Sequence, residues 1–337
     1  MIRSPGTNGR FVLTPPAAPR ACRPVTAALE LRDLHFGYGR AAAVRGVSLT
    51  LRPGDCYGFL GHNGAGKTTV LRLALGLVRP QRGSVRIFGV DALRDPVQAH
   101  AQVGALVERP GFHLAQSARS NLRALARLQG LPRTLAAAES GRVLELLGLA
   151  AAADAAVGTF SLGMRQRLGI AQALVGEPAA LILDEPANGL DPEGIAWMRT
   201  LLRDFADRGG TVLLSSHLLH EVQATADHLV VISDGAVVTA GRLDDLLASS
   251  TILVRSVDPG ALAAALRAAQ IDYVTGPGDA LTVDVAGGRI TTEVLARVAS
   301  DHQVLLTELR ESETNGLAEL FFSLTGTTVA ADQEAAA

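Results

Sequence analysis

Lysine is almost absent from this 337-residue chain, because Lys67 is the only lysine among 31 basic residues. Aromatic residues make up 4% of the sequence. The two cysteines, Cys22 and Cys56, are spaced neither like a metal cluster nor like a disulfide framework, which fits a reducing, cytosolic compartment. No uncharged run approaches the roughly 18 residues of a membrane-spanning helix. The net charge of −2 gives no basic field for a polyanion, so we expect no nucleic-acid partner.

The sequence has the composition of a globular protein, with 48% hydrophobic and 19% charged residues. Its length favours one large domain and one small domain. Residues 1–26 combine several prolines and arginines with no acidic residue, and we expect a disordered tail there and at 327–337.

The hydrophobic pattern between residues 27 and 247 predicts a mixed α/β domain. Apolar runs predict two antiparallel strands near Leu29–Leu31 and Val44–Leu51 and buried strands at Cys56–Leu60, Ala180–Leu183, Thr211–Leu214 and Leu229–Ile232. Helical spacing is found at Thr68–Leu77, Ser120–Leu128, Leu135–Leu147 and Leu162–Leu174. The last three of these segments predict a helical subdomain over about residues 111–175.

The pattern changes after residue 250, where short elements alternate. We expect strands at Ile252–Val257, Ile271–Val274, Leu281–Val285 and Val304–Leu309, and helices at Pro259–Ala269, Ile290–Ala299 and Leu317–Leu324. The order β-α-β-β-α-β, followed by a helix, predicts a small α+β ferredoxin-like domain over residues 250–326.

A glycine-rich segment lies between a predicted strand and a predicted helix. Residues 61–68 read Gly-His-Asn-Gly-Ala-Gly-Lys-Thr, which fits the phosphate-loop pattern G-x-x-x-x-G-K-[ST]. We expect this loop to bind the phosphates of ATP, with Lys67 on the β- and γ-phosphates and Thr68 on Mg²⁺. The alternative is a glycine-rich turn that matches by chance. The expected nucleotide contacts are Gly61, His62, Asn63, Gly64, Ala65, Gly66, Lys67, Thr68 and Thr69.

Two adjacent acids follow a buried strand at Asp184 and Glu185. Carboxylates in this position cost solvation energy unless they face a cation or a polar cleft. Because the carboxyl ends of parallel strands hold the ligand site of an α/β sheet, we expect Asp184 to ligate Mg²⁺ and Glu185 to polarise the attacking water. The alternative is a surface turn with both acids solvated.

Five ordered motifs resemble the ATP-binding subunits of ABC transporters. They are Tyr38, the phosphate loop, the signature segment 160–166 (Phe-Ser-Leu-Gly-Met-Arg-Gln), the acid pair with the D-loop Asn188–Asp191, and His217. The resemblance implies the ABC ATPase variant of the phosphate-loop fold, with a mixed sheet core, an antiparallel β subdomain and a helical subdomain. It also implies ATP hydrolysis, a homodimer or heterodimer of ATP-binding subunits, and permease subunits on separate chains.

The resemblance further implies roles for single residues. Tyr38 stacks on adenine, unless it is only a turn residue. His217 contacts the γ-phosphate, unless it is structural. Ser161, Gly163 and Asp191 face the nucleotide of the opposite subunit. Glu108 stands where most members carry a glutamine, and its carboxylate is a further Mg²⁺ ligand.

The departures from the general signature, together with Glu108 and the small C-terminal domain, resemble the branch of bacitracin- and lantibiotic-type exporters. This branch implies export of an antibiotic, a peptide or another amphiphile, by a cytoplasmic subunit held on the inner face of the membrane through its permease. A non-transport ABC ATPase is the alternative, although such proteins usually carry two cassettes or a long coiled coil. A phosphate-loop kinase or GTPase would lack the signature segment and His217.

Overall fold

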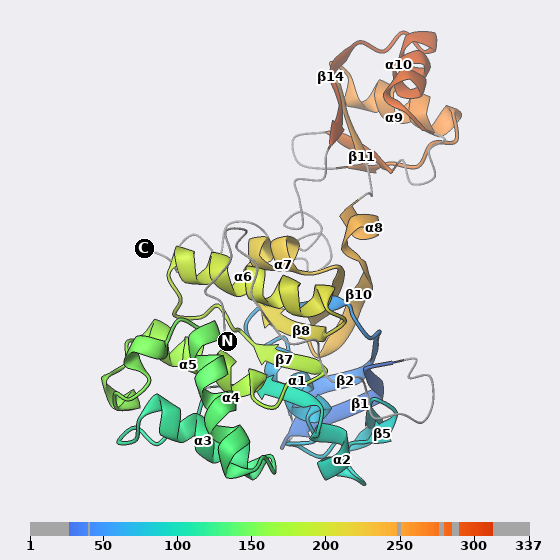
Figure 1. The fold of residues 1–337 in the computed structure, drawn as a ribbon. Helices are drawn as coiled ribbons and strands as arrows, with labels where there is room; N and C mark the ends of the chain where they lie inside the picture. The colour runs from blue at the N-terminus through green and yellow to red at the C-terminus, as the bar shows by residue number, and fades with distance from the viewer. Residues whose placement is uncertain are drawn as a thin grey trace. The chain divides into compact units, whose positions relative to one another are not determined.

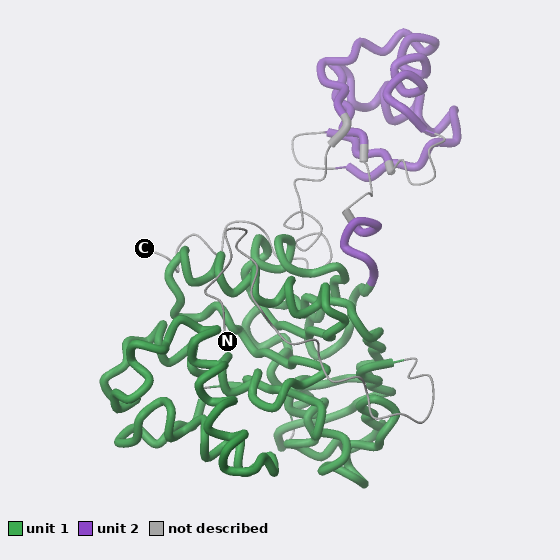
Figure 2. The backbone as a smooth tube through the Cα atoms, viewed as in Figure 1, with its two compact units in different colours: residues 1–240 green, residues 241–337 purple. Residues whose placement is uncertain are grey.

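The computed structural model describes residues 27–39, 41–108, 110–247, 251–275, 280–284 and 290–312. The predicted tails 1–26 and 327–337 and the predicted helix Leu317–Leu324 lie outside these residues. The chain divides into two compact units, residues 1–240 and 241–337 (Figure 2), which are described separately below. The predicted domain bounds, 27–247 and 250–326, remain predictions.

A six-stranded sheet forms the centre of the first unit, in the order β10-β9-β3-β8-β7-β6 (Figure 1). Its strands are β3 (Cys56–Leu60), β6 (Val103–Leu106), β7 (Ala180–Asp184), β8 (Thr211–Ser216), β9 (His228–Ser233) and β10 (Ala236–Arg242). The neighbouring strands from β9 to β6 run parallel. Every residue of β3, β7 and β8 is buried, which explains their uninterrupted apolar runs. The four strands predicted here are confirmed.

A second, antiparallel sheet has the order β2-β1-β4-β5. It consists of β1 (Leu29–Tyr38), β2 (Ala41–Leu51), β4 (Arg82–Ile87) and β5 (Val90–Asp91). The predicted antiparallel pair corresponds to β1 and β2, whose register joins Leu29 to Leu51. One apolar core connects this sheet to α1 (Lys67–Ala74) and to the central sheet, and includes Leu31, Val85, Val70 and Phe59.

The predicted helical subdomain contains three long helices: α3 (Ala118–Leu128), α4 (Arg133–Leu146) and α5 (Leu162–Leu174). Short 3-10 turns at Ala150–Ala152 and Val157–Thr159 connect α4 to α5. Figure 1 shows these helices grouped beside the sheet, and α5 packs on β6. The remaining helices of this unit are α2 (Pro96–His100), α6 (Pro192–Asp207) and α7 (Leu219–Thr225).

The second unit contains a four-stranded antiparallel sheet of order β12-β13-β11-β14. After α8 (Leu243–Leu247), the chain forms β11 (Thr251–Ser256), α9 (Pro259–Ala268), β12 (Val274–Thr275), β13 (Leu281–Asp284), α10 (Thr292–Asp301) and β14 (Leu306–Ser312). This is the expected β-α-β-β-α-β order. Apolar side chains from both helices and from the sheet form the core of this unit.

The strand predicted at Ile271–Val274 is wrong over most of its length. The amide of Ile271 donates to the carbonyl of Leu266, and Gln270 adopts a φ of +56°. These residues therefore close the C-terminus of α9. Ile271 is buried because it packs back against the core, and the strand begins only at Val274.

Candidate active site

The glycine-rich loop joins the end of β3 to the start of α1, as its motif requires. Gly64 and Gly66 have φ values of +84° and +105°. A Cβ on Gly66 would come within 2.7 Å of the carbonyl oxygen of Ala43, so no other residue fits there. Gly66 is also the N-cap of α1 and offers no side-chain cap. The first N–H groups of α1 are therefore available to an anion.

The remaining loop residues differ in exposure. His62, Asn63 and Gly64 are exposed, and the ring Nδ1 of His62 lies 2.9 Å from the carbonyl oxygen of Asn63. Ala65 and Thr69 are buried. The loop thus presents its apex to solvent while its base is fixed in the core.

Lys67 is the one buried cation among the described residues, with 6% of its surface exposed. Its ammonium donates to the carbonyl oxygen of Gly61 at 2.6 Å and lies 3.4 Å from Oε1 of Glu185. A buried ammonium needs such partners, and the compact point charge of lysine fits between them where a planar guanidinium would not. The fold thereby places the only lysine between the phosphate loop and the acid pair.

Thr68 and Asp184, two of the three predicted Mg²⁺ ligands, are in contact. Thr68 Oγ1 donates to Asp184 Oδ2 at 2.7 Å, and Ser215 Oγ donates to Asp184 Oδ1 at 2.6 Å. Hard oxygen atoms of this kind suit Mg²⁺, which usually takes one or two protein oxygens and completes its shell with phosphates and water. Within the described residues, no three or more His, Cys, Asp or Glu side chains gather into a group that could hold a metal ion.

Glu185 and His217 form the second half of the site. The ring Nδ1 of His217 lies 2.7 Å from Glu185 Oε2. Glu185 has a φ of +47°, in the left-handed region that a non-glycine residue rarely adopts without support. Ser215 Oγ supports it by accepting from the Glu185 amide at 2.9 Å, and Gln166 Nε2 donates to the carbonyl oxygen of Pro186 at 2.9 Å.

The signature segment caps a helix and packs on the D-loop. Ser161 is the N-cap of α5 and accepts from the amide of Met164 at 3.2 Å. A Cβ on Gly163 would lie 3.2 Å from the carbonyl oxygen of Gly189. Asp191 caps α6. Among the described residues, no hydrogen bond or ion pair joins segment 160–166 to loop 61–68.

Tyr38 and Glu108 are connected through an arginine that the sequence did not point to. Arg72 Nη1 donates to the Tyr38 hydroxyl at 3.0 Å, and Arg72 Nη2 pairs with Glu108 Oε1. Tyr38 is half exposed, at 50%. Glu108 follows β6 with a φ of +63°. Its carboxylate therefore has a cationic partner on α1.

Sequence reasoning missed three polar residues of the site: Ser215, Gln166 and Arg72. Ser215 ends the buried strand β8, and a hydroxyl at the carboxyl end of such a strand could have been paired with the acids that end β7. Gln166 belongs to the signature segment but received no role of its own. Arg72 lies on α1 five residues beyond Lys67, and nothing in a single sequence links it to Tyr38 or Glu108.

This constellation of loop, acid pair, histidine and signature helix defines a phosphate-loop ATPase of the ABC type. A family model described as ABC transporter matches residues 44–188. The bacitracin transport ATP-binding protein BcrA of Enterococcus faecalis is 33% identical over 305 residues, covering 88% of this chain and 96% of the relative. The chain therefore belongs to the ATP-binding proteins of ABC transporters and is an ABC transporter ATPase.

Two further relatives support the same branch. The BcrA protein of Bacillus licheniformis is 42% identical over 219 residues, which cover 65% of this chain and 71% of the relative. The linearmycin resistance ATP-binding protein LnrL of Bacillus subtilis (strain 168) is 30% identical over 310 residues, which cover 89% of this chain and 99% of the relative.

A solved structure described as the ATP binding subunit of an ABC transporter superposes with a TM-score of 0.61 at 30% identity, covering 65% of this chain and 91% of the other. It confirms the ABC ATPase fold, with its mixed sheet and antiparallel subdomain. Within the part of the chain that the structure describes, no helix has the length and apolar character needed to cross a bilayer.

Proposed function

We propose that this chain binds and hydrolyses MgATP to drive the export of an antibiotic, a peptide or another amphiphile through separate transmembrane subunits. The observation that carries the proposal is the meeting of Lys67, Glu185 and His217 beside the Thr68–Asp184 pair. The relatives named for bacitracin transport and linearmycin resistance supply the class of cargo.

Each side chain of the site has a defined task in this proposal. Lys67 neutralises the β- and γ-phosphates, because it is the buried cation beside the loop. Thr68 and Asp184 hold Mg²⁺, which neutralises developing charge on the phosphates. Glu185 accepts a proton from the attacking water, and His217 orients Glu185 and contacts the γ-phosphate. Tyr38 stacks on adenine.

We infer that hydrolysis takes place between two ATP-binding subunits, identical or not. Ser161 is the N-cap of α5, and its hydroxyl accepts from the Met164 amide. The other N–H groups of the first turn have no partner within the helix, so this helix start suits a phosphate. The hydrogen bond of Ser161 ties it to its own helix and not to its own phosphate loop. Gly163 lies in the first turn of α5 and Asp191 is the N-cap of α6. In this proposal Ser161, Gly163 and Asp191 meet a nucleotide that is held by the opposite subunit of a two-fold pair.

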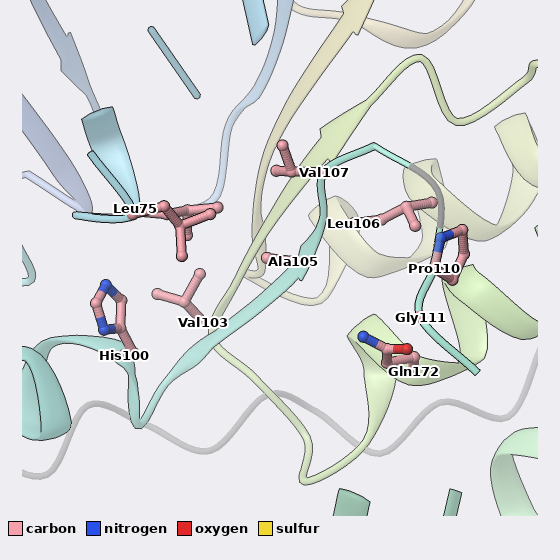
Figure 3. Close-up of a pocket in the computed structure, with 10 residues that line it drawn as sticks. Leu75, His100, Val103, Ala105, Leu106, Val107, Pro110, Gly111 and Gln172 are labelled. Atoms are coloured by element: carbon pink, nitrogen blue, oxygen red, sulfur yellow. The ribbon is translucent and has the colours of Figure 1, made fainter. Parts of the chain in front are cut away.

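The permease contact is proposed at a cavity beside the helical subdomain. This cavity, of about 330 Å³, is shown in Figure 3 with β6 running through it, Leu75 on one side and Pro110 and Gln172 on the other. Leu77, which also lines the cavity, is 67% exposed. His100 Nε2 at its wall is buried without a hydrogen-bond partner. An apolar hollow with one unsatisfied nitrogen suits a helix end or loop that brings both an apolar and a polar side chain.

The finer features of the second unit also remain proposals. Its strand order and antiparallel pairing support a ferredoxin-like domain. We propose domain bounds of 27–247 and 250–326. With its cargo path in separate chains, the protein would act from the cytoplasmic face of the membrane.

The experiment is a resistance assay with a matched catalytic variant. A bacitracin-sensitive host receives this chain together with the membrane protein that co-purifies with it, and the chain carries either the wild-type sequence or Glu185→Gln. We expect the wild type, and not the variant, to raise the bacitracin concentration that the host tolerates. If bacitracin has no effect, the same pair is tested with linearmycin. Equal tolerance with both sequences would overturn coupling to export, and no phosphate release by the purified wild-type complex would overturn the ATPase site.

A further inference from the structure

Building on the proposed ATP site, we propose that Arg72 is a positioning residue that holds Tyr38 and Glu108 in place together. One guanidinium would thereby organise the adenine side and the phosphate side of the same nucleotide. Arg72 does not itself need to touch ATP. Its contribution is to fix the Tyr38 ring that stacks on the base and to neutralise the Glu108 carboxylate on the phosphate side.

The geometry assigns a separate nitrogen of Arg72 to each partner. Nη1 donates to the Tyr38 hydroxyl at 3.0 Å, while Nη2 pairs with Glu108 Oε1. The planar fork of a guanidinium can serve two acceptors in fixed directions, whereas an ammonium is a single point charge. Arg72 belongs to α1, the helix that begins at Lys67. The bridge is therefore built on the same rigid element as the phosphate-binding lysine.

Tyr38 needs a second point of attachment to keep its ring in place. It is the last residue of β1 and is 50% exposed. Phe36 contacts it edge-to-face, with 4.9 Å between ring centroids. The hydrogen bond from Arg72 fixes the far end of the ring. A ring that is already held loses less conformational entropy when a base stacks on it.

Glu108 presents the opposite problem, because it adds a carboxylate near the proposed binding place of a triphosphate. Its φ of +63° also requires support from outside the backbone. Pairing with Arg72 neutralises the carboxylate and fixes the turn that carries it. Without this pairing, a free carboxylate would repel the phosphates of ATP.

The same contacts could instead be an ordinary surface ion pair, since the side chains of Arg72 and Glu108 are 30% and 54% exposed. Such pairs often contribute nothing measurable. The two readings differ in one respect. An ordinary pair would leave ATP affinity unchanged when it is removed, whereas the proposed bridge makes the effect of Arg72 depend on whether residue 108 carries a charge.

The experiment is a double-mutant cycle on ATP affinity, measured by calorimetry with MgATP. The four proteins are the wild type, Arg72→Ala, Glu108→Gln and the double variant. We expect Arg72→Ala to weaken MgATP binding about 5- to 10-fold in the wild-type background and at most about 2-fold in the Glu108→Gln background. Arg72→Lys restores the charge without the fork and is expected to recover affinity only in part.

The base side is tested with a ligand that has no base. Tyr38→Phe removes the hydroxyl that accepts from Arg72 and keeps the ring. We expect this variant to weaken binding of MgATP and to leave binding of Mg-tripolyphosphate as in the wild type. A loss of equal size with both ligands would overturn the adenine-side half of the proposal.

Arg94→Ala is the matched control, because Arg94 is an exposed arginine with a single distant carboxylate partner, 3.8 Å away. It is expected to bind MgATP as the wild type does. Equal losses from Arg72→Ala in both backgrounds, or no loss in either, would overturn the bridge. If instead the wild type binds no MgATP, or Lys67→Ala binds it equally well, the proposed ATP site fails and not the bridge.

Discussion

His217 and Glu185 meet across the ends of two neighbouring parallel strands, with 2.7 Å between Nδ1 and Oε2. The register of β7 and β8 sets this distance, because it places Asp184 opposite Ser215 and so brings the residues that follow each strand together. The other oxygen of the Glu185 carboxylate lies 3.4 Å from the Lys67 ammonium. A single carboxylate is thus held between a histidine ring and a buried cation.

Glu185→Gln is expected to keep MgATP binding and to slow hydrolysis about 100-fold or more, because an amide cannot accept the proton of the attacking water. Release of phosphate under saturating ATP measures this effect. Glu145→Gln, on the exposed face of α4, removes a carboxylate outside the site and is expected to hydrolyse ATP at the wild-type rate. If Glu185→Gln hydrolysed ATP at the wild-type rate, another residue would have to be the general base.

The same Glu185→Gln protein should form stable pairs with MgATP, because slow hydrolysis preserves the nucleotide between the subunits. Size-exclusion chromatography with light scattering measures the mass with and without MgATP. A Ser161→Tyr change at the start of α5 is expected to abolish pairing while leaving nucleotide binding by the phosphate loop. A monomer in saturating MgATP would contradict the shared site.

Lys67→Ala is expected to abolish detectable MgATP binding, because the loop then has no buried cation to offset the phosphate charge. Lys67→Arg should not rescue binding, since the guanidinium is too wide for the space between the carbonyl of Gly61 and Glu185. Both affinities can be measured by calorimetry. Retained affinity in Lys67→Ala would place the nucleotide elsewhere.

Ser215→Ala removes a hydroxyl that serves both acids, donating to Asp184 and accepting from the amide of Glu185. Leaving buried polar groups unpaired costs about 1–3 kcal/mol, and we expect a loss of stability in that range together with a lower kcat. Ser140→Ala is the control, because Ser140 is equally buried but bonds only within α4. Ser140→Ala should lower the free energy of unfolding and leave kcat unchanged.

Asp227 should contribute to the acid stability of the fold. Burial opposes its ionisation, but hydrogen bonds from the Arg203 side chain and the Cys56 amide outweigh burial and lower its pKa below the usual 3.8. A lowered folded-state pKa gives stability that is present above the unfolded value and is lost as pH falls through the folded one. We therefore expect Asp227→Asn to be less stable than the wild type at neutral pH, and this difference to shrink below about pH 4. Urea unfolding across this range measures it.

Cys56 should be chemically inert in the folded protein. Burial, followed by the charge of Asp227, raises the pKa of its thiol to about 12. The thiolate is the reactive form, so almost none is present at neutral pH. In a Cys22→Ser variant, a disulfide-exchange reagent at pH 8 should react with no thiol until guanidinium unfolds the chain. A rapid reaction in the native state would contradict this.

Local chemistry made much of the fold predictable. The bounds Cys56–Leu60 and Leu162–Leu174 follow from an apolar run and from helical spacing, and the structure has both as predicted. The strand β4 was missed because Arg82, Gly83 and Arg86 interrupt its pattern, and its burial is supplied by pairing with β1. Ile271 was misread because its burial serves a helix end.

The site was predictable where a motif is continuous in sequence and unpredictable where strands bring distant residues together. Lys67 and Glu185 could each be predicted from the residues that flank them in sequence. The 3.4 Å between their charged groups could not, because it depends on the pairing of strands in the central sheet. Ser215 acts only through the register of β8 against β7. Arg72 contacts Tyr38 and Glu108 only because the fold brings α1 beside the residues that end or follow β1 and β6.

The solitary lysine has a practical consequence. A protease that cleaves only after lysine can cut this chain at a single peptide bond, the one between Lys67 and Thr68. In the native fold that bond lies within the first turn of α1, and the side chain of Lys67 is almost fully buried. The appearance of two fragments on a gel would therefore report, without any label, how often the loop and its helix come apart, and bound nucleotide should slow their appearance.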